Sequence, residues 1–144
     1  MRLSAKGEYA LRALLDLASL ESDGLVPIQD IAARQRIPQR YLEQVLLALK
    51  RAGLADSRRG SAGGYRLGRA PGDISVGAVL RAVEGQAHAA RGARHADDAG
   101  DLAELLQRID EAISGVVDRV TLLDLKRRAE ERRSAARPRR SGPP

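Results

Sequence analysis

The chain has 144 residues, a length that fits one domain or one domain plus an appendage, and its 25 lysines and arginines against 19 aspartates and glutamates give a net charge of +6. Cysteine is absent, which excludes disulfides, thiolate zinc sites, cysteine-ligated iron–sulfur clusters and cysteine nucleophiles. There is no Phe or Trp and there are three Tyr, so a sheet that stacks single-stranded bases on aromatic rings is not expected. The basic balance favours a polyanionic partner, nucleic acid before a membrane surface.

The amino-terminal segment does not have the pattern of a targeting sequence. Charged residues at Glu8, Arg12 and Asp16 interrupt its apolar residues, and no small-residue cleavage site follows. No apolar run anywhere approaches the about 18 residues that a membrane span needs. We therefore expect a cytoplasmic protein.

Charge is distributed unevenly along the chain. Residues 1–70 hold 12 basic and 7 acidic side chains, residues 71–131 hold 8 and 12, and residues 132–144 hold 5 and none. The last block contains only Arg, Pro, Ser, Gly and Ala, which cannot form a core. We expect a basic, disordered tail over 126–144, either solvated or in nonspecific contact with phosphate.

The first half of the chain contains three helical patterns. Apolar residues recur every three or four positions over 4–20, 28–36 and 38–52. Pro27 stands near the start of the second segment, where a missing N–H costs little, and Pro38 separates the second segment from the third. Because the second and third segments are separated by one or two residues only, they predict two helices joined by a tight turn.

A glycine-rich hairpin and a short helix follow. Residues 54–59 and 64–67 are strand candidates on either side of the glycine-rich tip 60–63, and Ser75 caps a predicted helix over 76–84. The glycines do not form a nucleotide phosphate loop, because the Gly-Lys-Ser/Thr ending is missing.

The second half predicts a linker and one long helix. Residues 86–100 contain no large apolar side chain, so we expect a flexible linker there. A heptad-like apolar stripe then runs over 101–125, and Thr121 could recap a final short turn. The stripe could pack on the first domain or on a second copy; as a dimer interface it would contain Leu102, Leu106, Ile109, Ile113, Val116 and Val120.

This order of elements predicts a mainly α fold with a small β-hairpin wing: a winged helix-turn-helix over 1–85 and a long C-terminal dimerisation helix. In such a fold the third helix presents its polar face to the major groove. Gln pairs with adenine, Arg with guanine, and Glu accepts from cytosine. The outward residues near the start of that helix are Gln39, Arg40, Glu43 and Gln44.

The hairpin supplies a second set of DNA contacts. Arg58 and Arg59 precede a tip with almost no side chains, so the backbone can approach DNA closely. Arginine is suited to a narrow minor groove, where the negative potential is strongest, and the Ser61 hydroxyl can bind phosphate.

Several strings resemble the Rrf2 family of bacterial transcription regulators, the IscR-, NsrR- and CymR-type proteins. They are MRLSAKGEYALRALLDLA (1–18), IPQRYLEQVLLALKRAGL (37–54), SRRGSAGGYRL (57–67), ISVGAVLRAVEG (74–85) and VTLLDL (120–125). The resemblance implies a homodimer on a palindromic operator, with crossed long helices and base readout from the start of the third helix. It places Arg59 in the minor groove and implies neighbouring contacts from Lys6, Tyr41, Ser61 and Tyr65.

The chain departs from the cluster-binding members of that family. Those members carry three cysteines in the stretch that corresponds to 86–100, and this chain has none. Glu8, His88 and His95 cannot hold a cluster alone, and two histidines seven residues apart in a loop match no standard metal site. We therefore expect no cofactor and no metal.

The pattern as a whole predicts a sequence-specific regulator of transcription, a repressor that binds double-stranded DNA as a homodimer. The alternative is a cluster-free adaptor that acts by binding a partner protein such as a metabolic enzyme; a small-molecule effector is also open. An enzyme is not expected, because no nucleophile, base and metal set can be assembled from the sequence.

Overall fold

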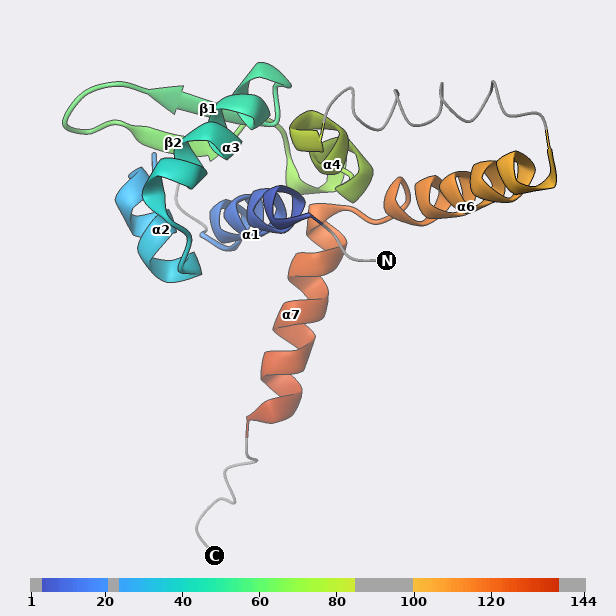
Figure 1. Ribbon diagram of the computed structural model, residues 1–144. Helices are drawn as coiled ribbons and strands as arrows, with labels where there is room; N and C mark the ends of the chain where they lie inside the picture. The colour runs from blue at the N-terminus through green and yellow to red at the C-terminus, as the bar shows by residue number, and fades with distance from the viewer. Residues whose placement is uncertain (1–3, 21–23, 85–99, 138–144) are drawn as a thin grey trace, which may run out of the picture.

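Helices dominate the part of the chain that the structure, a computed structural model, describes: residues 4–20, 24–84 and 100–137 (Figure 1). The elements are α1 (Ala5–Ser19), α2 (Ile28–Gln35), α3 (Gln39–Arg51), β1 (Ala55–Arg58), β2 (Gly64–Leu67), the 3-10 turn η1 (Pro71–Asp73), α4 (Val76–Glu84), α6 (Asp101–Val117) and α7 (Leu122–Ala136). The predicted mainly α fold with a two-stranded wing is confirmed.

One aliphatic core holds the winged-helix body together. Helix α1 lies at its centre and contacts α2, α3, α4 and α7. The largest side chains that are fully buried are Leu14, Ile31, Leu42, Leu46, Leu49, Ile74, Leu122, Val45 and Val79. None of these side chains is aromatic. The core is built from Leu, Ile and Val, which recur at helical spacing on one face of each helix and pack against one another.

Helices α1 and α4 approach closely at a glycine. A Cβ on Gly7 would lie 2.9 Å from Cδ2 of Leu80 and 3.0 Å from Oε1 of Glu84, so a larger residue could not sit there without a shift. The Ser4 hydroxyl accepts a hydrogen bond from the Gly7 amide at 3.1 Å and donates one to Glu84 Oε1 at 2.6 Å. The N-cap of α1 is therefore also a contact to α4.

The carboxyl-terminal segment differs from its prediction. A continuous helix over 101–125 is wrong, because α6 ends at Val117 and α7 begins at Leu122. The predicted recapping at Thr121 is confirmed, although the helix that it starts is longer than the expected short turn. Between them the chain makes a turn at residues 118–119 and then pairs with the segment before α4: the Val76 amide donates to Val120 O at 2.8 Å, and the Leu122 amide donates to Ile74 O at 2.9 Å. These bonds, and burial of Leu122 in the core, outweigh continuation of the heptad pattern.

Disorder from residue 126 onward is also a wrong prediction as far as Ala136, where α7 ends. The predicted linker over 86–100 lies outside the described residues except for Gly100, and the end of the tail, 138–144, also lies outside them. None of the described helices is long and apolar enough to cross a membrane.

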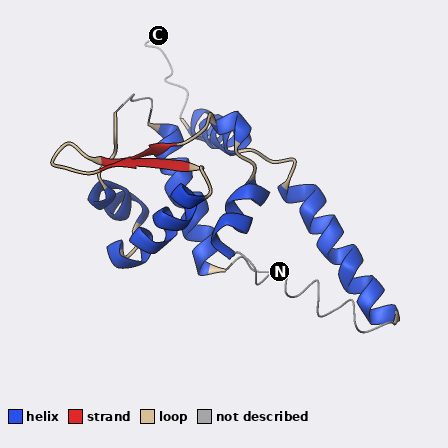
Figure 2. Ribbon diagram, turned by 90° about the horizontal axis from the view of Figure 1, so that it is seen from above, coloured by secondary structure: helices blue, strands red, loops and turns tan. Residues whose placement is uncertain are grey.

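The hairpin and α6 lie at opposite ends of the molecule. The loop of the hairpin projects beyond the helices on one side, while α6 extends from the body on the other side, as Figure 1 and the perpendicular view of Figure 2 show. A surface on α6 is therefore well separated from the wing.

Candidate nucleic-acid interface

Helix α3 is held by one face and leaves the other free. Its buried stripe is Leu42, Val45, Leu46 and Leu49. The predicted reading residues all lie on the exposed side: Gln39, Arg40, Glu43 and Gln44. Sequence reasoning missed Leu47 on this side, which is 47% exposed and lies one turn beyond Glu43. Its position four residues after Glu43, which places both on the same helix face, was the signal that could have identified it.

The turn between α2 and α3 fixes the direction of α3. Arg36 adopts a left-handed conformation with φ 53° and ends α2, and the Ile37 amide donates to Ala32 O at 3.1 Å. The Ile37 side chain is buried, and Pro38 then starts α3 as its N-cap. A non-glycine residue at positive φ is uncommon, so burial of Ile37 and the caps on both sides define this turn.

Helix α2 is fastened to α1 by a charged contact that the sequence did not predict. Asp16 is almost fully buried and accepts hydrogen bonds from Arg34 Nε at 3.0 Å, Arg34 Nη2 at 2.9 Å and Gln35 Nε2 at 3.1 Å. The hydrogen bond to Asp16 raises the pKa of Arg34 above its usual value. The available signal was an acidic residue inside the apolar stripe of the first helix.

The two tyrosines among the predicted contacts serve the core in the structure. Tyr41 is half-buried, and its ring meets that of Tyr9 edge-on, with centroids 5.3 Å apart. Tyr65 is half-buried on β2, and its backbone exchanges two 2.8 Å hydrogen bonds with Val26. Lys6 is exposed in the first turn of α1.

The wing is a short antiparallel hairpin in the register Ala55↔Leu67 to Arg58↔Gly64. Arg58, Arg59 and Ser61 are exposed on it. Gly60 at the tip has φ 112°, and nothing lies within 4 Å of where its Cβ would be, so the tip is open. The arrangement gives a cationic loop whose backbone can be approached closely.

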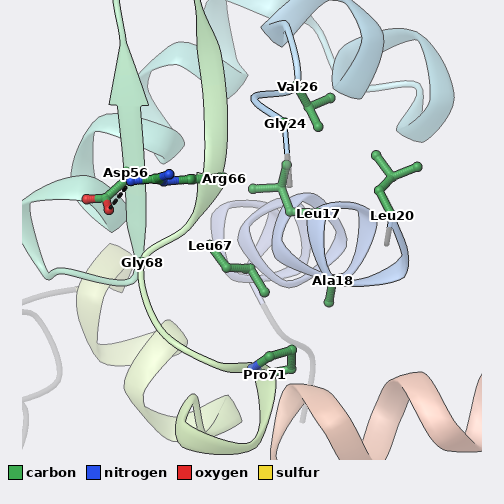
Figure 3. Close-up of a pocket in the computed structure, with 10 residues that line it drawn as sticks. All are labelled: Leu17, Ala18, Leu20, Gly24, Val26, Asp56, Arg66, Leu67, Gly68 and Pro71. Carbon is green, nitrogen blue, oxygen red and sulfur yellow. Dashed lines mark ion pairs between the residues drawn. The ribbon is translucent and has the colours of Figure 1, made fainter. Parts of the chain in front are cut away.

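Arg66 is directed differently from the other wing arginines. It faces Asp56 across the strand pair, with Nη2 and Oδ2 3.8 Å apart. The pair lines a hollow of about 530 Å³ between α1 and the base of the hairpin, whose other walls include Leu17, Val26 and Leu67 (Figure 3).

Helix α6 carries the predicted apolar stripe, most of it uncovered. Exposure is 68% at Leu102, 40% at Ile109 and 64% at Val116, with a further 53% at Leu105, while Leu106 and Ile113 are half-buried. Val120 lies beyond the end of α6, in the extended connector. Among the described elements, α6 contacts α4, and just past the end of α6 Arg81 Nη1 lies 2.9 Å from Asp118 Oδ1.

This chain is similar in sequence to known transcriptional regulators. A family model described as "Rrf2: Iron-dependent Transcriptional regulator" matches residues 3–128. The HTH-type transcriptional regulator IscR of Photobacterium profundum is 43% identical over 131 residues, 88% of this chain and 76% of that protein. The corresponding IscR of Serratia proteamaculans is 43% identical over 129 residues, 87% and 79%.

Solved structures agree with these relatives. T. potens IscR superposes with a TM-score of 0.79 at 34% identity, covering 96% of this chain and 93% of that one. CymR, the global cysteine regulator of B. subtilis, superposes with a TM-score of 0.69 at 32% identity, covering 88% and 96%.

Iron appears in the family description, so the donor set of this chain decides whether a cluster fits. The sequence contains no cysteine, and an iron–sulfur cluster is held mainly by cysteine thiolates. Its two histidines, His88 and His95, lie outside the described residues, and within the described ranges no three His, Asp or Glu side chains gather as a metal site would need. The residues do not fit an iron–sulfur cluster.

The match over most of the chain, the identity to IscR proteins and the shared winged-helix architecture lead to one conclusion: this chain belongs to the Rrf2 family of DNA-binding transcriptional regulators, which are not enzymes.

Proposed function

We propose that this protein is a cytoplasmic, cluster-free repressor that binds a palindromic operator as a homodimer. The observation that carries the proposal is that α3 and the hairpin, which contact each other through one core, both leave polar and cationic side chains exposed. Such a pair of elements suits simultaneous contact with a major groove and the adjacent minor groove.

The start of α3 would read the bases. Gln39 and Gln44 can each make a bidentate pair with adenine, Arg40 can pair with guanine, and Glu43 can accept from cytosine N4. All four side chains are exposed, and the stripe on the opposite face anchors the helix in the core. Major-groove readout therefore needs no rearrangement of α3.

The wing would enter the minor groove with Arg59, while Arg58 and Ser61 contact phosphates beside it. Lys6 is exposed and available for a phosphate contact. Tyr41 and Tyr65 keep their hydroxyl groups as candidate donors, although their rings pack on the core. We assign these two residues the smaller contribution.

A second copy of the chain would cover α6. Its apolar stripe has more exposed surface than a lone helix in water can sustain, and the heptad-like spacing is that of helix pairs. Pairing about a twofold axis would set the two wings at the outer ends of the dimer, since hairpin and α6 lie at opposite ends of each protomer. The half-sites would then lie about one DNA turn apart, or a multiple of it. Occupation of that site would obstruct polymerase.

Selection from a randomised duplex pool, together with the absorption spectrum of the purified protein, tests operator binding and the cluster-free state. We expect an enriched motif with twofold symmetry, bound by a dimer, and a colourless protein that gains no visible absorption on incubation with iron and sulfide. The matched variant is Glu43→Ala, which should enrich a motif altered at one base pair in each half-site. Recovery of no motif, or of an unsymmetrical one, would contradict the proposal.

A further inference from the structure

Helix α7 carries a concentration of positive charge that lies outside the candidate DNA contacts of α3 and the wing. Over residues 126–137 six cationic side chains stand against Glu130 and Glu131, a net charge of +4. The six are Lys126, Arg127, Arg128, Arg132, Arg133 and Arg137.

These cationic groups are free to meet a partner. Every residue from Arg127 to Arg137 is exposed. Among the described residues, none of the six cationic groups takes part in an ion pair; the one hydrogen bond from the group is Arg133 Nε to Ala129 O at 3.4 Å. Glu130 and Glu131 lower the charge of the segment, and Arg127 and Arg128 act on Asp124 through space, but the net positive charge faces the solvent.

The same part of α7 has no large apolar side chain. Leu122 is buried and Leu123 and Leu125 are half-buried, but beyond them the apolar residues are alanines only. A membrane-surface helix needs a face of large apolar residues, and the centre of a protein interface is depleted of charge. The composition instead suits a ligand that is itself a dense array of negative charge.

The base of α7 is capped and is anchored in the core by Leu122, so the arginines form a directed arm. Thr121 and Asp124 make a reciprocal capping box, with Thr121 N to Asp124 Oδ2 at 2.9 Å and Asp124 N to Thr121 Oγ1 at 3.1 Å. The helix leaves the body beside α1 and extends away from the hairpin (Figure 1). Its 15 residues give it a length of about 22 Å.

From these observations we propose that α7 is a second DNA-binding element, an arginine arm that contacts duplex phosphates outside the base pairs covered by α3 and the wing. The inference rests on the proposed DNA-binding function. Duplex DNA is favoured over an acidic protein because its phosphates are regularly spaced and dense, and because guanidinium groups match phosphate oxygens. Such contacts add affinity without adding sequence preference.

The test compares two duplexes that contain the same selected operator. One ends at the operator edges, and the other continues for two helical turns on both sides. The full-length protein is compared with the fourfold variant Arg127→Gln, Arg128→Gln, Arg132→Gln and Arg133→Gln. The matched control replaces the same four arginines by lysine, which keeps the charge, and circular dichroism checks the helix content of both variants.

We expect the unmodified protein and the lysine control to bind the longer duplex more tightly, with a steeper dependence on salt. The glutamine variant should bind the two duplexes equally, and the slope of log K against log salt should fall by about 0.9 for each lost phosphate contact. Its affinity for the short duplex should stay unchanged.

Two results would overturn the arm. One is a glutamine variant that keeps both the length preference and the salt slope. The other is a variant whose monomer–dimer equilibrium shifts while its salt slope does not, which would assign α7 to a second copy of the chain. Failure of the proposed function is a separate result, because it would remove the specific complex on the short duplex for every variant; the salt slope on nonspecific duplex would still report on α7.

Discussion

Asp16 of α1 and Arg34 of α2 are joined by two parallel hydrogen bonds of 3.0 and 2.9 Å, with the carboxylate 4% exposed and the guanidinium side chain 43% exposed. This two-point geometry fixes the angle between the helices as well as their distance. Because α2 packs on both α1 and α3, the pair also sets the position of the reading helix relative to the body.

Replacing Arg34 should therefore destabilise the fold. In Arg34→Met the buried Asp16 carboxylate keeps only the Gln35 amide as a side-chain partner, and we expect a loss of about 1.5–3 kcal/mol in the free energy of unfolding. Urea unfolding at one fixed protein concentration measures it. The matched control is Arg12→Met, whose pair with Glu8 is 3.9 Å long and solvent-exposed and should contribute less than about 1 kcal/mol. Equal losses would contradict the assigned role.

Periodicity and turn residues predict the winged-helix body because they report local preference and burial together. The helices of the first half and the glycine hairpin appear as predicted, and the exposed set Gln39, Arg40, Glu43 and Gln44 follows from the buried stripe of α3. The contacts of side chains across the core could not be predicted in this way. Asp16 meets Arg34 across 18 positions of sequence, and Tyr41 meets Tyr9 across 32, so only the packed structure brings them together.

The carboxyl-terminal half shows where a helical pattern loses to tertiary contact. The apolar spacing continues past Val117, but Val120 and Leu122 pair their backbones with the strand-like segment around Ser75. Thr121 and Asp124 mark the restart of the helix in the sequence itself. The capping signal can be read from the sequence, whereas the bridge between Ser75 and Thr121 depends on where residues 74–76 lie in the fold.

The capping box should make α7 sensitive to acid. The hydrogen bonds that Thr121 donates to the Asp124 carboxylate, the one from its backbone amide first, hold the pKa of Asp124 below the ordinary aspartate value. Because this pKa is lower in the folded state than in the unfolded state, the ionised carboxylate stabilises α7 at every pH above the ordinary aspartate pKa. That stabilisation is lost as the pH falls through the lowered pKa, below about pH 4. Helicity followed by circular dichroism through that range should decrease. The Asp124→Asn variant should lack this component, and identical titrations would contradict the assignment.

The wing arginines should differ in their effect on DNA binding. Arg59→Ala removes an exposed cation next to the open tip, and we expect operator affinity to fall by about 1–3 kcal/mol if its side chain enters the minor groove. Arg66→Ala is the matched control, since that arginine faces Asp56 at the base of the hairpin. Titration by fluorescence anisotropy at one salt concentration measures both. A larger loss for Arg66→Ala would move the DNA contact from the tip to the base.

Dimerisation should depend on the exposed stripe of α6. Ile109 is 40% exposed at the middle of the stripe, and Ile109→Glu would place a carboxylate where a second copy packs, so we expect monomers in sedimentation and loss of operator binding. The matched control is Gln107→Glu, an exposed position on the polar side of the same helix, which should stay dimeric. The winged-helix body should remain folded in both variants, because α6 contributes no buried residue to its core. A dimer that survives Ile109→Glu would require an interface elsewhere on the chain.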